Sequence, residues 1–158
     1  MAQKYLMAVD VGTQSTRVAL LDFEGHIVSS SSTLQDMQTP RPGWAEQDPQ
    51  VWWDNTVINT KKVLAQSGIP PQSIMGIGVS GQMHGAVPLD SKGDLLSHGV
   101  QLWCDKRSAD LVEQLKTQPG FDNAFRIAAN PPVANWVGFK LKWIQVFQPE
   151  IYSKIWKV

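Results

Sequence analysis

The first third of the sequence consists of short β-forming segments joined by turns, and this pattern constrains the fold more than any other feature. Apolar residues dominate 5–9 and 17–23, and β-forming residues mixed with serine follow over 27–34. Glu24-Gly25-His26 is typical of a tight turn between the second and third segments. The pattern therefore predicts an antiparallel meander: a strand, a tight loop, a strand, a turn and a strand.

A long helix is predicted after the meander. Asp48-Pro49 combines an N-cap acceptor with a proline at the first helical position, and Gly68 and Pro70-Pro71 end the segment, so the helix should run from Pro49 to about Ser67. Its apolar residues form two stripes, which predict burial on more than one side. The stripes consist of Val51, Ile58 and Ala65, and of Trp53, Val57 and Leu64.

The remaining sequence alternates between strand and helix signals. Helical spacing of Trp136, Phe139, Trp143 and Phe147 predicts a helix on which Lys140 lies on the apolar side, with its stem packed and its head reaching water or a carbonyl. The other predicted elements are strands at 74–79 and 100–103, helices at 108–116 and from Pro149, and the beginning of a strand at 155–158.

Composition excludes several classes of function. Fourteen Lys and Arg residues balance fourteen Asp and Glu residues, so no global electrostatic attraction to nucleic acid or to a membrane surface is expected. The apolar runs are too short for a transmembrane helix, and the first residues do not resemble a signal peptide. The single cysteine, Cys104, excludes an internal disulfide framework and a multi-cysteine zinc site, and it is interpreted as a small apolar filler. These features predict a soluble protein of the cytoplasm.

The loop between the first two predicted strands carries groups that suit a phosphate. Gly12 lets the backbone approach an anion closely, and Thr13 and Ser15 offer hydroxyl donors. Asp10 could hold a hydrated Mg²⁺ ion, and Arg17 could offset phosphate charge. The loop lacks the ending of a Walker A motif, and the alternative interpretation is a polar hairpin turn.

Two further motifs carry groups that suit a sugar. Gln82 and His84 provide planar hydrogen-bonding groups beside the apolar side chain of Met83, although a histidine satisfied in a bend between strands is the commoner explanation of such a segment. Trp103 and Asp105 combine an aromatic face with a carboxylate that can accept two hydroxyls. The alternative there is a core tryptophan with Asp105 capping the next helix, and both roles can hold together.

The order and spacing of these motifs resemble the FGGY family of carbohydrate kinases. The motifs are DxGTxSxR from Asp10, GWAEQDP over 43–49, GxSGQMHG ending at Gly85, and LWxDxR from Leu102. GFKLKW over 138–143 is similar to the next helix of the family, so the resemblance covers nearly the whole chain. The QMHG sequence points to xylulokinases, although sedoheptulokinases can show a similar sequence.

The resemblance implies an α/β chain with the actin-like ATPase (ribonuclease H-like) fold, containing a mixed sheet, an antiparallel β-meander and flanking helices. Members have two domains, with ATP and sugar in the cleft between them. Residues 1–158 match the front part of the first, sugar-binding domain, which is expected to be incomplete, while the second, nucleotide domain is absent. The cut sheet predicts an open edge, which invites self-association or is covered by the missing domain.

The resemblance also implies a reaction: transfer of the γ-phosphoryl group of MgATP to a ketose, with D-xylulose giving D-xylulose 5-phosphate. Asp10 would organise the hydrated Mg²⁺, and Gly12, Thr13, Ser15 and Arg17 would face the phosphates. Gln82, Met83, His84, Trp103 and Asp105 would line the ketose pocket. The family's catalytic aspartate lies in a later segment, so the chain alone is expected to be inactive.

Other functions remain open from the sequence. Sedoheptulose or ribulose could be the ketose. A non-catalytic module that binds a sugar or a partner chain is an alternative of a different class. Another ATPase of the same superfold would also be compatible with the DxGT loop, but the QMHG and LWxDxR sequences argue against it.

Overall fold

The computed structural model describes residues 3–158, apart from the side chain of residue 124. The chain forms two compact units. The first unit contains residues Met1–Met37 and Pro49–Gln82, and the second contains Gln38–Asp48 and Met83–Val158. The predicted phosphate residues lie in the first unit, and Met83, His84, Trp103 and Asp105 lie in the second.

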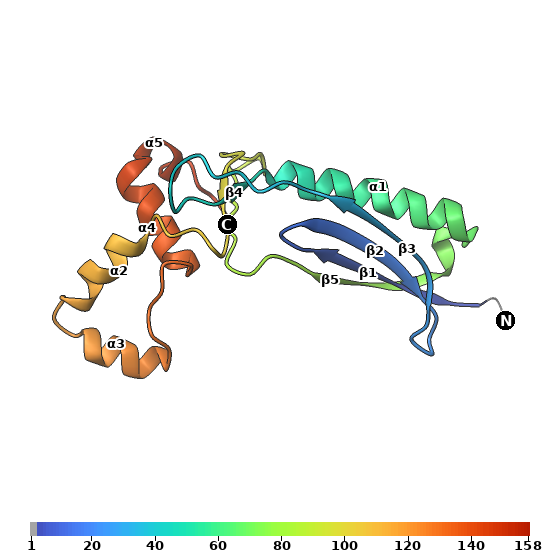
Figure 1. Ribbon diagram of the computed structural model, residues 1–158, viewed down its shortest axis with the longest axis horizontal. Helices are drawn as coiled ribbons and strands as arrows, with labels where there is room; N and C mark the ends of the chain where they lie inside the picture. Colours follow the sequence, from blue (N-terminus) through green and yellow to red (C-terminus); the bar gives the residue numbers. More distant parts are fainter. Residues whose placement is uncertain (1–2) are drawn as a thin grey trace. The chain divides into compact units, whose positions relative to one another are not determined.

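The first unit is a mixed sheet with one long helix, as predicted. Strands β1 (Tyr5–Val11), β2 (Ser15–Leu21) and β3 (Ile27–Leu34) form the antiparallel meander, and β5 (Ile74–Ser80) pairs with β1 in parallel. The strand order is β3-β2-β1-β5. Helix α1 (Pro49–Ser67) has the predicted bounds and lies along the sheet (Figure 1). A single 3-10 turn at Pro71–Ser73 leads into β5.

The core of this unit lies between α1 and one face of the sheet. Alternation along β1 and β2 places every second side chain on this face, as the period of a strand requires. Each large apolar side chain buried there contributes about 1.5–3 kcal/mol to the free energy of folding. The buried cluster consists of Met7, Val9, Val18, Leu20, Val63 and Ile69.

The predicted apolar stripes of α1 are largely wrong, although Leu64 of the second stripe packs against the core. Trp53 is 64% exposed, and Val51 and Ile58 are also exposed. The side chains that α1 buries include Asn55 and Asn59. The reason lies in β3, whose inward-facing side chains are serine and threonine rather than apolar residues, so that amides pack against them.

Asn59 shows how this polar face is satisfied. Its Oδ1 accepts hydrogen bonds from Ser31 Oγ at 2.7 Å and Thr33 Oγ1 at 3.1 Å, and its Nδ2 donates to the Thr16 carbonyl at 3.0 Å. Because Asn59 is fully buried, these bonds replace the water that its amide loses on folding.

The regular secondary structure of the second unit is mainly helical, with a short antiparallel pair between β4 and β6. The strand predicted at 100–103 shortens to the two residues of β6. Instead of the strand predicted at 155–158, the structure has an isolated bridge between Leu89 and Lys157. No described helix is long and apolar enough to cross a membrane. The elements are β4 (Glu46–Gln47), β6 (Val100–Gln101), α2 (Ala109–Lys116), α3 (Phe121–Ala128), α4 (Val137–Phe147) and α5 (Pro149–Tyr152).

Helix α3 was not predicted. It follows Gly120, whose φ is 87°, and it ends at Ala129, whose φ is 51°. The rings of Phe121 and Phe125 stack one turn apart at 6.5 Å. The segment is only two turns long and lacks a Ser, Thr, Asp or Asn at the N-cap, so the usual start signal of a helix is missing.

Candidate functional site

The loop between β1 and β2 is tight and depends on a glycine. The Gly12 N–H donates to the Ser15 carbonyl at 2.9 Å, and the Gln35 N–H donates to the Gln14 carbonyl at 2.9 Å. A Cβ atom at position 12 would lie 3.2 Å from the Ser15 oxygen, closer than ordinary van der Waals contact. A side chain at position 12 would therefore require the Ser15 carbonyl to move by a few tenths of an ångström.

Two glutamine side chains hold the same loop through one carbonyl. The Nε2 groups of Gln35 and Gln82 both donate to the Gly12 oxygen, Gln82 at 3.1 Å. Thr13 Oγ1 donates to Gln82 Oε1 at 3.4 Å. Gln82, predicted to contact a sugar, therefore lies against the phosphate-type loop. Sequence reasoning missed Gln35, because a single glutamine after a serine-rich strand forms no motif.

Gln35 connects the loop to α1 through a buried network. Its Oε1 accepts hydrogen bonds from Thr16 Oγ1 at 2.9 Å and from Asn55 Nδ2 at 3.2 Å. All three of these side chains are buried. Partners that are themselves fixed by packing hold a loop in one geometry before any ligand arrives. The loop is preorganised in this way.

Asp10 and Arg17 lie on the sheet face opposite the core. They are paired across β1 and β2, and both side chains are exposed. Among the described residues, no group of three or more His, Cys, Asp or Glu side chains could hold a metal ion. A lone exposed carboxylate nevertheless fits Mg²⁺ when the ion keeps most of its waters and also binds substrate phosphates.

The second unit presents Met83 and His84 at its surface. Met83 is 69% exposed, and the side chain of His84 is also exposed. His84 has a φ of 59°, in the left-handed region that residues other than glycine rarely adopt. Its carbonyl accepts a hydrogen bond from the Nζ of Lys140. The turn at His84 is therefore an unusual conformation with an identifiable support.

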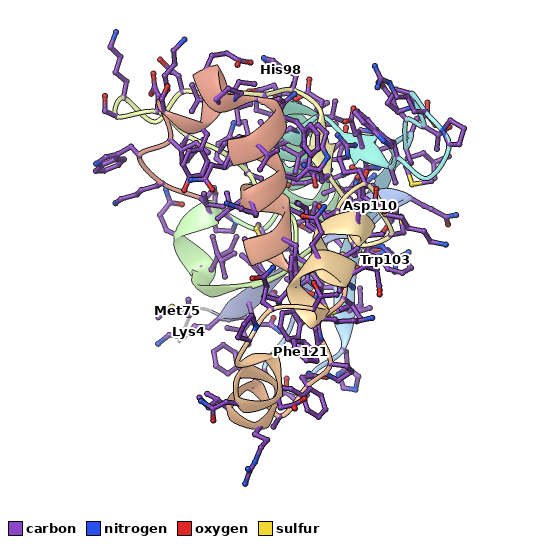
Figure 2. All side chains as sticks on the ribbon, turned by 90° about the vertical axis from the view of Figure 1, so that its left-hand side faces the viewer. Lys4, Met75, His98, Trp103, Asp110 and Phe121 are labelled. Atoms are coloured by element: carbon purple, nitrogen blue, oxygen red, sulfur yellow. The ribbon has the colours of Figure 1, made fainter. Side chains whose placement is uncertain are left out.

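Trp103 and Asp105 differ sharply in exposure. Trp103, labelled in Figure 2, is 47% exposed, whereas Asp105 is 2% exposed. The Asp105 carboxylate accepts hydrogen bonds from the Ala45 N–H at 2.7 Å and the Arg107 N–H at 2.9 Å. Helix α2 begins after Ser108 and has no side-chain cap. The interpretation of Asp105 as a helix cap is therefore wrong, because its oxygens are used by Ala45 and Arg107.

Arg107 is the centre of a buried charged cluster. Its Nη2 lies 2.7 Å from Asp105 Oδ2 and 2.6 Å from Glu46 Oε1. Its guanidinium lies 3.6 Å from the ring centroid of Trp44, and Trp44 meets Trp143 edge to face at 5.4 Å. Opposite charges and an aromatic face compensate a buried guanidinium for lost water.

The sequence model of the FGGY family of carbohydrate kinases, N-terminal domain, matches residues 5–158. The chain belongs to the FGGY family. A curated relative, the xylulose kinase of Escherichia coli K12, is 32% identical over 152 residues, which are 96% of this chain and 30% of the relative. This FGGY chain spans about a third of the length of the relatives that it matches.

Solved structures agree with this family and with the actin-like α/β fold expected from the sequence. The xylulose kinase of Rhodospirillum rubrum matches with a TM-score of 0.88 and 27% identity, over 96% of this chain and 31% of that one. A Plasmodium falciparum glycerol kinase with ADP matches with a TM-score of 0.84 and 25% identity, over 96% of this chain and 30% of that one.

The second unit of this FGGY chain also contains a cavity of about 390 Å³. Met83, His84 and Trp103 are not among its lining residues. Its charged lining includes Glu46 and Arg107, which already pair with each other. The cavity is therefore separate from the exposed side chains that the motifs single out.

Proposed function

We propose that this chain supplies the sugar-side part of an ATP-dependent ketose kinase that converts D-xylulose to D-xylulose 5-phosphate. The observation that carries the proposal is the family match over residues 5–158. Similar proteins include xylulose kinases and a glycerol kinase solved with ADP, which supports phosphoryl transfer from ATP. The QMHG sequence is the reason for choosing a ketose, and D-xylulose among the ketoses.

On this proposal, the loop after β1 receives the terminal phosphates of MgATP. Gly12, whose own N–H donates to the Ser15 carbonyl, would let the phosphates approach the loop closely. The backbone N–H of Thr13 and the hydroxyl of Ser15 would donate to phosphate oxygens, and Arg17 would balance part of their charge. Asp10 would hold a water of the hydrated Mg²⁺. The ion neutralises charge that develops on the phosphates during transfer.

The ketose would lie against the exposed side chains of the second unit. Trp103 offers an aromatic face, Met83 an apolar surface and His84 a hydrogen-bonding ring. Gln82 and Asp105 have intramolecular partners, so we assign them the role of holding the phosphate loop and the Arg107 cluster rather than direct contact with sugar. Their effect on the ketose would be indirect.

The proton of the attacking hydroxyl needs an acceptor that we place outside these residues. We propose that residues 1–158 are the sugar-binding side of the first domain, and that further sequence of the natural protein supplies the catalytic base and the nucleotide domain. The 158-residue chain alone is then inactive, because neither the base nor the closure that excludes water is present. Its single cysteine is consistent with a cytoplasmic enzyme.

The test starts with the mass of the natural gene product, which should be well above the 17.5 kDa of this chain. The purified product is then assayed for ADP release with MgATP and D-xylulose, D-ribulose, sedoheptulose or glycerol. Preference for D-xylulose supports the proposal, and preference for another polyol would correct the substrate. A product of about 17.5 kDa that binds a ketose without turnover would instead indicate a binding module.

A further inference from the structure

Lys140 is a fully buried lysine whose ammonium group donates hydrogen bonds to three backbone carbonyls. Lys140 is 0% exposed and lies on α4. Its Nζ donates to the carbonyls of His84, Gln101 and Leu102, the last two at 3.0 Å and 2.8 Å. An ammonium has three N–H groups, so these carbonyls use all of its donors. The expected packed stem is confirmed, and its head reaches carbonyls.

The three carbonyls belong to two separate segments that carry the exposed candidate residues. His84 holds the left-handed turn after Met83. Gln101 ends β6, and Leu102 follows it directly before Trp103. A left-handed residue with a side chain persists only where its surroundings impose it. The ammonium is one such constraint, and it joins the turn to the chain that presents Trp103.

We propose that Lys140 is a positioning residue that fixes the His84 turn relative to Trp103 and thereby sets the affinity for the ketose. The inference rests on the proposed function, since that function assigns these two surfaces to the sugar. Lys140 itself is too deeply buried to touch a substrate. Simultaneous hydrogen bonds to carbonyls of both segments are needed, and a compact ammonium with three donors on a flexible stem provides them.

The substitution Lys140→Met tests this proposal, because methionine fills similar space without N–H donors. In the natural gene product, the KM for D-xylulose should rise about tenfold or more, while the KM for MgATP and kcat change by less than about threefold. Lys142→Met is the matched control on the same helix, where the exposed lysine contacts Gln145. Its kinetic constants should equal those of the unmodified protein.

A second measurement does not depend on activity. Hydrogen exchange in the 158-residue chain should become about tenfold faster at the amides of Gly85 and Trp103 in Lys140→Met, and stay unchanged in β1 and β2. If the unmodified gene product phosphorylates no sugar, the proposed function is wrong, but exchange still decides whether Lys140 joins the segments. Unchanged exchange at both amides, or equal losses for ketose and MgATP, overturns the proposal.

Lys140→Gln covers the case in which the methionine variant does not fold. Glutamine keeps two N–H donors on a shorter side chain, so the KM for D-xylulose should rise by an intermediate factor of about three to ten. A KM equal to that of the unmodified protein would show that the ammonium does not position the sugar surface.

Discussion

Burial determines what the carboxylate of Asp105 can do. Its side chain is 1% exposed, and its oxygens accept from Ala45 and from three N–H groups of Arg107. A carboxylate in these surroundings has little capacity left for a hydroxyl of a ligand. In the sequence, an aspartate directly after a predicted strand favours sugar binding. In the structure, the burial and the hydrogen bonds of Asp105 indicate a structural role.

Replacement of Asp105 by alanine should therefore destabilise the chain. Removing one partner of a buried ion pair leaves an uncompensated charge and costs about 3 kcal/mol, here reduced to the extent that Glu46 continues to pair with Arg107. Urea unfolding followed by tryptophan fluorescence measures the change, with the exposed Lys106→Ala as control. Unfolding equal to that of the control would show that the carboxylate is free to serve a ligand.

Lys140 should make the free energy of unfolding depend on pH in the alkaline range. Burial lowers the pKa of Lys140 from 10.5 to about 8, opposed by the nearby Asp105 and Cys104 and reinforced by Arg107. Between these two values the unfolded chain binds more protons than the folded chain, so stability rises with pH. Below pH 8, Lys140 is protonated in both the folded and the unfolded chain, so the full free-energy cost of burying its charge opposes folding.

Comparison with Lys140→Met isolates this contribution from other titrating groups. The difference in unfolding free energy between the unmodified chain and the variant should grow in favour of the unmodified chain from pH 8 to 10.5. The neutral amine still offers two N–H donors, so the contacts are not all lost. Urea titrations of both proteins at several pH values across this range measure the difference. A difference that shrinks with rising pH would mean that the carbonyls hold the ammonium more strongly than water does.

At the scale of elements, α1 depends on amides rather than on an apolar stripe. Asn59 is fully buried and joins α1 to Ser31, Thr33 and Thr16. Asn59→Ala leaves these polar groups without their partner. Since two or more buried hydrogen bonds are lost, the free energy of unfolding should fall by about 2–4 kcal/mol. Chemical denaturation checks this value, with the exposed Lys62→Ala expected to change stability by less than about 0.5 kcal/mol. A smaller loss for Asn59→Ala would mean that water replaces the amide.

The ends of α1 could be predicted from the sequence, but its buried face could not. Asp48-Pro49 and Gly68 are local signals, and they act whatever the helix packs against. The buried face depends on β3, a strand that ends at Leu34, well before the helix begins at Pro49, and whose serines prefer an amide over an apolar side chain. The same reasoning applies to the site. Glycine and hydroxyl residues marked the loop at Gly12, whereas Gln35 joins it only through the tertiary fold.

At the scale of the whole molecule, the sheet of the first unit ends in an apolar edge strand. Within the described residues, β5 pairs with β1 and lies last in the strand order. Its side chains include Met75, Ile77 and Val79, which are 54%, 64% and 74% exposed. An edge with free backbone groups and apolar side chains is a template for another strand. β5 is therefore an edge strand of the kind that invites association.

We expect the 158-residue chain to associate with a second copy through this edge. Sedimentation velocity should show a species that grows with concentration, and Val79→Lys should reduce it, because a charge on an edge strand opposes strand addition. Leu34→Lys is the matched control. Leu34 is 82% exposed and lies at the end of β3, the strand at the other edge of the sheet. A chain that stays monomeric at every concentration would contradict this prediction. Association of the chain together with a monomeric natural gene product would indicate that further sequence covers β5 in the natural protein.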